Sequence, residues 1–331
     1  TDKGLTDKAI ELVNKEIQSQ TKYVTWCLRK LASLYYQKGE FELARKIYDD
    51  VLSKRDIGWA KLGMGKVQIA LGNYQEAIDG LSGLLGENEN LIEAYDWLAE
   101  AQLKKGATHE AQKTLQNAVA ISPFAIIRQK KLAEVSVKNK DIEGAADAYR
   151  YSVKLGYNSV HESPENYLNL GRCLSDLSEG DTSELGKKRA KEATQTLARV
   201  GKKFKDNADV KTSALLIESR VHKGQGDEAK SKTLLVQAEN SMDVANAGAQ
   251  TALEFAKTLY SLGEEGQAEQ VLSELAQQNE GNQSVMNEIE DLLDEPVSLN
   301  KRVKARKLNK AGISAFEGGD LNAAIEVFND A

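Results

Sequence analysis

Side chains capable of metal, acid-base or nucleophilic chemistry are few and far apart in this chain. The three histidines are His109, His161 and His222, and the two cysteines are Cys27 and Cys173. No histidine lies within helical reach of another or beside a cysteine, whereas metal sites and Ser/His/Asp sites need converging groups. The sequence also lacks a CxxC pair and a phosphate-binding glycine loop after a strand pattern. We therefore expect no enzyme activity, no metal and no cofactor.

Composition narrows the class of protein further. The chain has 331 residues, a formal net charge of −6, 28% charged residues and only three prolines, which is typical of a water-soluble helical protein. No apolar run approaches the roughly 20 residues that span a bilayer, so we expect no membrane segment and a cytoplasmic location. The acidic balance disfavours nucleic acid as a partner unless basic residues gather on one face.

A repeated pattern of glycine, alanine and a large apolar residue organises the chain. Its clearest copies read GEFELARKIY, GNYQEAIDGL, GATHEAQKTL and GGDLNAAIEVF. The alanines Ala44, Ala77, Ala111 and Ala145 are 33, 34 and 34 residues apart. This spacing resembles the tetratricopeptide repeat (TPR), in which each unit is a pair of antiparallel helices. It predicts an all-α, right-handed superhelical solenoid.

The repeats divide the chain into five predicted regions. They comprise a capping or linker helix at 1–24, four regular repeats at 25–157, divergent repeats five to seven at 158–279 with an insertion near 178–188, a charged connector at 280–304, and an incomplete repeat at 305–331, which suggests that a longer chain continues beyond it.

Repeats four, five and six each differ from the pattern in one detail. Repeat four has Lys140 where the others place glycine, so we expect Asn139 to take the left-handed helix-ending position. In repeat five either Ala190 or Ala193 could be the reference alanine. In repeat six we assign Ala229.

The inner face of the first helix of each repeat is the predicted binding surface, because TPR helix pairs form a concave groove there. Counting from the reference alanines gives ten candidates on this face: Trp26, Arg29, Tyr36, Trp59, Lys66, Asp96, Glu100, Lys130, Glu134 and Arg172. Aromatic side chains beside cations could hold a peptide by apolar burial and charge-assisted hydrogen bonds. In the alternative interpretation the tryptophans only pack on adjacent helices and the charges are only solvated.

The expected partner is a protein or peptide. Reversing Arg29, Lys66 and Lys130 to glutamate should abolish its capture with little change in melting temperature. The TPR subtype that grips C-terminal carboxylates uses lysine and asparagine at fixed positions, and repeat one has Arg29 and Ser33 there. That clamp is not reproduced.

One segment of the chain shows a more specific resemblance than the general repeat pattern. The segment 122–156 carries Ser122-Pro123, Arg128-Gln129, Glu143-Gly144-Ala145-Ala146 and Ala148-Tyr149-Arg150. It resembles the TPR output region of bacterial response regulators, which place a receiver domain before the array. The resemblance implies an effector region in two-component signalling, or phosphorelay, with any phosphoacceptor outside these residues.

Two other functions stay open. Exposed helices at the ends of an open array could support self-assembly, for example into a homodimer. A basic helix at 187–205 could bind a polyanion or nucleic acid. Its cations are Lys187, Lys188, Arg189, Lys191, Arg199, Lys202, Lys203 and Lys205. Only Phe204 could add base stacking there.

Overall fold

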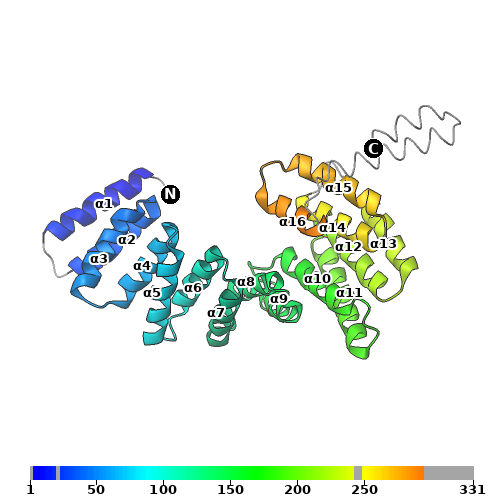
Figure 1. Cartoon of the computed structure of the whole chain (residues 1–331), viewed down its shortest axis with the longest axis horizontal. Coiled ribbons are helices and arrows are strands. Elements are labelled where there is room, and N and C mark those ends of the chain that lie inside the picture. The colour runs from blue at the N-terminus through cyan, green and yellow to red at the C-terminus, as the bar shows by residue number, and fades with distance from the viewer. Residues whose placement is uncertain (1–2, 20–22, 242–247, 294–331) are drawn as a thin grey trace. The chain divides into compact units, whose positions relative to one another are not determined.

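A computed structural model describes residues 3–19, 23–241 and 248–293, and in these ranges the chain forms sixteen α-helices and no strand. The predicted all-α class is confirmed. By their contacts the residues fall into two units, 1–155 and 156–331. Within each unit, consecutive helices pack side by side as antiparallel pairs (Figure 1).

Unit 1 begins with a single helix that packs on the first helix of the first pair. Its helices are α1 (Lys3–Gln18), α2 (Val24–Lys38), α3 (Phe41–Lys54), α4 (Gly58–Ala70), α5 (Tyr74–Glu87), α6 (Ile92–Lys105), α7 (Thr108–Ile121), α8 (Ile126–Lys138) and α9 (Ile142–Gly156).

Unit 2 continues the alternation with longer connections. Its helices are α10 (Pro164–Ser178), α11 (Glu184–Lys203), α12 (Ala208–Gly224), α13 (Glu228–Ser241), α14 (Ala249–Ser261), α15 (Glu265–Gln278) and α16 (Gln283–Leu293). Helix α16 lies inside the predicted connector at 280–304. The rest of that connector and the predicted incomplete repeat at 305–331 lie outside the described residues.

The reference alanines are fully buried in the helix packing of unit 1. Ala44, Ala77, Ala111 and Ala145 are each the fourth residue of a second helix, and each has no exposed surface. A methyl group at this position lets the paired helices approach closely, while larger neighbours such as Leu81 fill the space beside it. The alanine period therefore reports a packing constraint.

Repeat four ends its first helix differently from the prediction. Lys140 has a φ of 61°, in the left-handed region, whereas Asn139 has a φ of −86°. The Asn139 amide instead donates to the Thr108 carbonyl at 2.9 Å and to the Gln112 side chain at 2.7 Å. The proposed role of Asn139 was therefore wrong, because its side chain is needed to bond the preceding repeat.

The structure also resolves the reference positions of repeats five and six. Gly171 abuts Leu197 as Gly65 abuts Leu81, and Ala193 precedes Leu197 by the four residues that separate Ala77 from Leu81. Ala193 is therefore the reference residue of repeat five. In repeat six the fourth residue of α13 is the fully buried Ser231, which bonds Ser219 at 2.9 Å, so the assignment of Ala229 was wrong.

Candidate functional site

A pocket of about 340 Å³ opens among the first helices of unit 1. We call it the aromatic pocket. Its lining residues are Arg29, Ser33, Tyr36 and Gln37 on α2, Tyr48 on α3, Trp59, Leu62, Gly63 and Lys66 on α4, and Glu93 and Trp97 on α6. All of them belong to one unit, so the geometry of the pocket is internally fixed.

One wall of the pocket is a pair of aromatic rings set edge to face. The rings of Tyr48 and Trp59 are 6.1 Å apart at an interplanar angle of 62°. Tyr48 reaches this place because residue 63 is glycine. A Cβ there would lie 2.3 Å from the Tyr48 Cζ atom, well inside van der Waals contact. Gly63 is therefore required by the close approach of α3 to α4.

Two cations face the aromatic rings. The guanidinium of Arg29 lies 5.8 Å from the centroid of Trp59, and the Lys66 Nζ lies 5.1 Å from that of Trp97. Lys66 Nζ also donates to the Glu93 carboxylate at 2.5 Å. In the described part of the chain, Arg29 has no carboxylate within salt-bridge distance. Arg29 is thus the cation of the pocket that remains available to an acidic group.

The tyrosines contribute neutral hydroxyl groups. Burial raises the pKa of Tyr36, and it raises the pKa of Tyr48 against the opposing charge of Arg29. Both hydroxyls therefore stay protonated at neutral pH and can donate hydrogen bonds. The pocket combines apolar ring faces, hydroxyl donors and one available guanidinium, an arrangement that suits a side chain or peptide segment carrying a carboxylate.

Of the ten predicted residues, the pocket brings together Arg29, Tyr36, Trp59 and Lys66. Trp26 stays 63% exposed and does not line the pocket. Its exposure excludes the alternative that it packs between helices, whereas Trp59 does pack on Tyr48.

The next candidates along unit 1 are engaged with one another or with nearby charges. Asp96 accepts two hydrogen bonds from Arg128, at 2.9 and 2.7 Å. Glu100 accepts from Lys131 at 2.9 Å. The remaining two, Lys130 and Glu134, lie 3.8 Å apart on the surface of α8. Asp96 and Glu100 are thus neutralised by cations of the next first helix, α8, whereas Lys130 and Glu134 pair within α8 itself.

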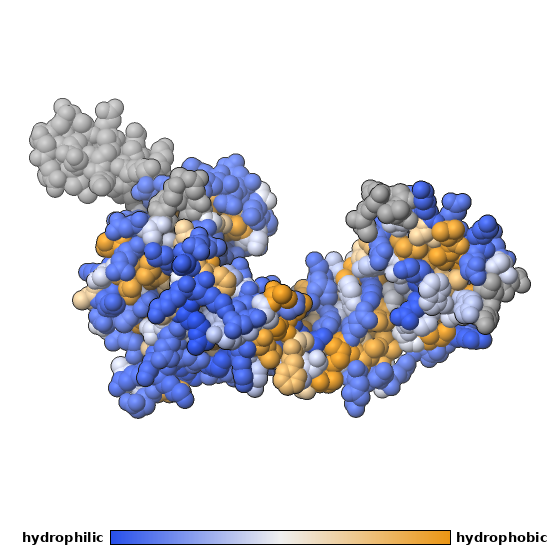
Figure 2. Space-filling model, turned by 180° about the vertical axis from the view of Figure 1, so that it is seen from behind, coloured by the Kyte–Doolittle hydropathy of each residue, from blue (hydrophilic) through white to orange (hydrophobic). Residues whose placement is uncertain are grey.

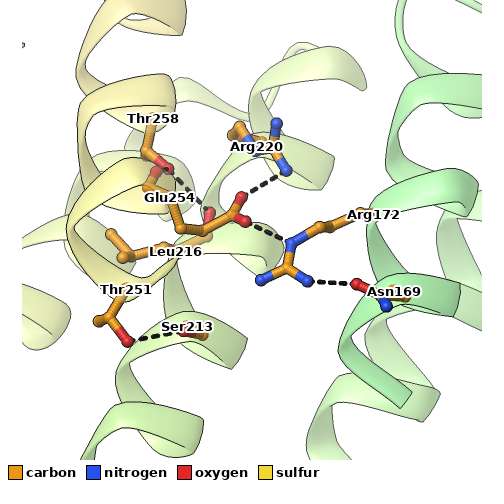
Figure 3. A network of polar contacts seen from close by, with 8 residues as sticks. All are labelled: Asn169, Arg172, Ser213, Leu216, Arg220, Thr251, Glu254 and Thr258. Carbon is orange, nitrogen blue, oxygen red and sulfur yellow. Dashed lines mark hydrogen bonds and ion pairs between the residues drawn. The ribbon is translucent and has the colours of Figure 1, made fainter. Parts of the chain in front are cut away.

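Arg172, the last candidate, belongs to a buried ion cluster in unit 2 (Figure 3). Its Nε donates to Glu254 Oε2 at 2.5 Å, and Arg220 Nη2 lies 2.6 Å from Glu254 Oε1. We call these three residues the arginine–glutamate cluster. Glu254 has no exposed surface. The cluster joins α10, α12 and α14, the first helices of three successive pairs.

The two arginines fix the charge of Glu254. Burial alone would raise the pKa of this carboxyl group, but the Arg220 and Arg172 guanidiniums outweigh burial and lower the pKa to about 2. Glu254 is therefore ionised at neutral pH. Glu254 Oε2 accepts a hydrogen bond from Arg172, and Oε1 is ion-paired with Arg220, so both oxygens of the buried carboxylate face a cation. Within the described residues, Arg172 Nη2 and Arg220 Nε are buried without a hydrogen-bond partner.

Several residues of the pocket and of the arginine–glutamate cluster were not predicted from the sequence. Glu93 and Trp97 lie one helical turn apart on α6, and the count from the reference alanine selected Asp96 and Glu100 instead. The spacing of Glu93, Trp97 and Glu100 is itself a helical stripe and could have revealed them. Glu254 and Arg220 gave no local signal, because Glu254 pairs with Arg172, 82 residues before it, and Arg220 pairs with Glu254 on a different helix.

The basic helix α11 is partly occupied by contacts of its own. Lys203 donates to Glu162 at 2.6 Å and lies 4.7 Å from the ring of Tyr157. The Phe204 ring packs against Tyr167 at 6.4 Å. This aromatic ring is thus turned toward the protein and is not presented for base stacking.

Comparison with known proteins agrees with the repeat pattern. A profile of the tetratricopeptide repeat family matches residues 26–55, which include most of α2 and α3. A TPR repeat-containing protein of Methanocaldococcus jannaschii is 29% identical over 168 residues, which is 46% of this chain and 28% of that protein. The chain therefore spans little more than a quarter of the length of this relative.

Solved structures show the same fold. The C-terminal part of a TPR repeat-containing protein from Cytophaga hutchinsonii has a TM-score of 0.54 and 16% identity, covering 72% of this chain and 95% of that one. A chain of the Naa15/Naa10 complex bound to HypK-THB has a TM-score of 0.53 and 16% identity, covering 90% of this chain and 42% of that one. The chain has the fold of a TPR solenoid, as its sequence predicts. Among the described helices, none is long and apolar enough to cross a membrane.

Proposed function

We propose that this chain is a protein-interaction scaffold without catalytic activity, and that the aromatic pocket of unit 1 binds a peptide segment of a partner. Proteins built from tetratricopeptide repeats generally mediate protein–protein interaction, through extended concave surfaces. The observation that carries the proposal is the open pocket in which Arg29 lacks a carboxylate partner among the described residues.

The pocket suggests what the bound segment contains. A large apolar or aromatic side chain would lie against Tyr48, Trp59 and Trp97, where edge-to-face ring contacts favour aromatic groups. A neighbouring carboxylate would pair with Arg29. The hydroxyls of Ser33 and Tyr36 line the same pocket and could donate to backbone carbonyls of the segment.

A peptide selection tests this proposal. A random peptide library is selected on the whole chain, and the Kd of recovered peptides is compared between the wild type and the Arg29→Glu/Lys66→Glu variant. We expect a loss of at least about tenfold, since charge reversal repels the carboxylate and disturbs both ring contacts.

Lys130→Glu is the matched control, because it reverses a cation on α8 outside the pocket. Its Kd should stay within about twofold of the wild-type value. Recovery of no peptide, or equal affinity of the wild type and the double variant, would refute the proposal.

The signalling role is a finer proposal within the same function. The motifs at 122–156 resemble the output region of receiver-plus-TPR response regulators, and this resemblance supports a cytoplasmic effector in a bacterial phosphorelay. The sequence of the gene upstream of residue 1 tests it directly. A receiver domain with an acidic phosphorylation pocket would support the role, and its absence there would remove it.

Self-association is a second candidate, favoured by an exposed apolar patch in unit 1. At the turn between α7 and α8, Phe124 is 79% exposed, Ile127 73% and Ile121 40%. Hydrophobic residues gather near the middle of the view, over α7 to α9 (Figure 2). Light scattering of the wild type and of Phe124→Glu/Ile127→Glu distinguishes this candidate. A mass that rises with concentration only in the wild type would support it.

A further inference from the structure

Unit 1 carries a second opening on the other side of α4. Residues that line the aromatic pocket from α4 are Trp59, Leu62, Gly63 and Lys66, whereas Lys61, Met64, Gly65 and Gln68 line a groove of about 270 Å³. Because the second set is offset by two residues, or about 200° around the helix, the two openings face opposite ways. The groove continues along α3 with Leu52 and along α5 with Glu76, Asp79, Gly80, Gly83, Leu84 and Glu87. We call it the glycine groove.

The two exposed glycines of the α5 wall are not required by packing within the chain. A Cβ built on Gly80 or on Gly83 would meet nothing within 4 Å. The glycine in the floor is different, because a Cβ on Gly65 would lie 2.7 Å from Leu81. Glycine in a helix interior is less favourable than alanine. At residues 80 and 83 no close packing within the chain requires glycine. Because these residues have no side chains, the groove beside α5 stays uncovered.

Chemically, the groove has an apolar floor and an acidic rim. Leu52, Met64 and Leu84 supply large apolar side chains to its lining. Glu76, Asp79 and Glu87 supply three carboxylates.

One cation enters the groove, and it is already paired. Lys61 Nζ lies 2.6 Å from Glu87 and 2.5 Å from Asp56. Glu76 and Asp79 have no cationic partner among the described residues, since Asp79 accepts only from Gln75 at 2.7 Å. The rim therefore keeps an uncompensated negative charge.

We propose that the glycine groove docks a cationic amphipathic segment of a partner protein, separately from the peptide bound in the aromatic pocket. Large apolar side chains of the segment lie on Leu52, Met64 and Leu84, and its lysines or arginines pair with Glu76 and Asp79. The open space at Gly80 and Gly83 lets the backbone of the segment approach α5 closely. A second copy of the same groove is a poor occupant, because it would bring the same carboxylates together.

The test uses a fluorescein-labelled 18-residue amphipathic peptide of lysine and leucine, with fluorescence anisotropy as the readout on the whole chain. Gly80→Ala/Gly83→Ala should weaken binding by about tenfold, because the methyl groups occupy the groove. The same substitutions should raise the melting temperature by about 2–4 °C each, because alanine favours the helix. A substitution that raises the melting temperature but weakens peptide binding indicates that the glycines serve docking and not folding.

Gly86→Ala is the matched control. Residue 86 is also in α5 and has nothing within 4 Å of its Cβ position, but it does not line the groove. It should raise the melting temperature without changing peptide affinity.

A second experiment reverses the charge of the rim. Glu76→Lys/Asp79→Lys should abolish peptide binding. Glu42→Lys/Asp49→Lys makes the same charge change on α3 outside the groove lining and should preserve most of the binding.

Three results would overturn the proposal. The first is no binding of the cationic peptide to the wild type. The second is equal binding by Gly80→Ala/Gly83→Ala, which would leave only a general attraction to acidic residues. The third is equal loss with the Glu42/Asp49 control. Arg29→Ala should leave the cationic peptide unaffected, so failure of the aromatic pocket and failure of the glycine groove are separate outcomes.

Discussion

The first helices of the two units use their facing side chains in opposite ways. In unit 1, residues of α2, α4 and α6 line an open aromatic pocket of about 340 Å³. In unit 2, residues of α10, α12 and α14 meet in the arginine–glutamate cluster around a fully buried carboxylate. The same arrangement of helix pairs thus supports a surface available to a partner and one occupied by the protein's own charges.

Equivalent positions show how the difference arises. Lys66 follows Gly65, which abuts Leu81, and Arg172 follows Gly171, which abuts Leu197. Lys66 bonds a carboxylate on the next first helix, α6, whereas Arg172 bonds one on α14, two first helices further on. The buried Glu254 on the third first helix thus brings Arg172 and Arg220 together in unit 2.

The largest effect should come from removing the charge of Glu254. Glu254→Gln leaves two arginines facing each other, and breaking a buried ion pair in this way destabilises by about 3–5 kcal/mol. Circular dichroism during urea unfolding measures it. All three tryptophans, Trp26, Trp59 and Trp97, lie in unit 1. Their fluorescence transition should therefore stay in place, and a shift of the fluorescence alone would contradict the comparison.

Acid should remove the stabilisation that the ionised Glu254 carboxylate gives to unit 2. The pKa of Glu254 is lowered in the folded protein to about 2, below its ordinary value of 4.5. Its contribution is then present above pH 4.5 and is lost as the pH falls toward 2. The difference in unfolding free energy between wild type and Glu254→Gln should narrow from pH 7 to pH 3. A difference that grows on acidification would contradict this account.

An intermediate effect is expected for Gly63→Ala in unit 1. The added methyl group meets the ring of Tyr48, which is only 6% exposed and has little room to move. Overpacking of this kind costs about 1–3 kcal/mol. The tryptophan fluorescence transition should move to lower urea, and peptide affinity should fall with it. Gly80→Ala is the control, because its Cβ meets nothing within 4 Å.

The smallest effect should come from Lys140→Gly, which should stabilise unit 1 alone. Lys140 holds a left-handed φ of 61°, which costs a residue with a Cβ about 1 kcal/mol relative to glycine. Lys140→Gly should therefore raise the urea midpoint of the fluorescence transition. It should leave the unit 2 transition unchanged. A lower midpoint would show that the lysine side chain stabilises the turn in some other way.

Short-range patterns predicted the fold, because helix pairs and their closest contacts are set by residues within about 34 positions. The spacing of Ala44, Ala77 and Ala111 reports such contacts directly. The same count placed Trp59 and Lys66 on one face of α4, and both line the aromatic pocket. Trp97 and Glu93 were missed because the count from the reference alanine selected Asp96 and Glu100 on α6, although the stripe of Glu93, Trp97 and Glu100 was visible in the sequence.

The rest of the site depends on contacts that no local pattern encodes. The residues around Arg172 in the sequence do not indicate whether its side chain faces a binding partner or a buried glutamate 82 residues away. Asn139 was assigned to a turn because its type tolerates that backbone, yet its side chain is used to bond Thr108. In both cases the residue type permits two roles, and the neighbouring repeat decides between them.

We propose that the aromatic pocket is open in the free protein and is covered when a partner binds. Maleimide labelling of Ser33→Cys, with and without a selected peptide, tests it most directly. The native Cys27 and Cys173 are buried and contribute little background. We predict rapid labelling of the free chain and at least about tenfold slower labelling at saturating peptide, while a Ser53→Cys control on exposed α3 stays fast. Equal rates at residue 33 with and without peptide would contradict the account.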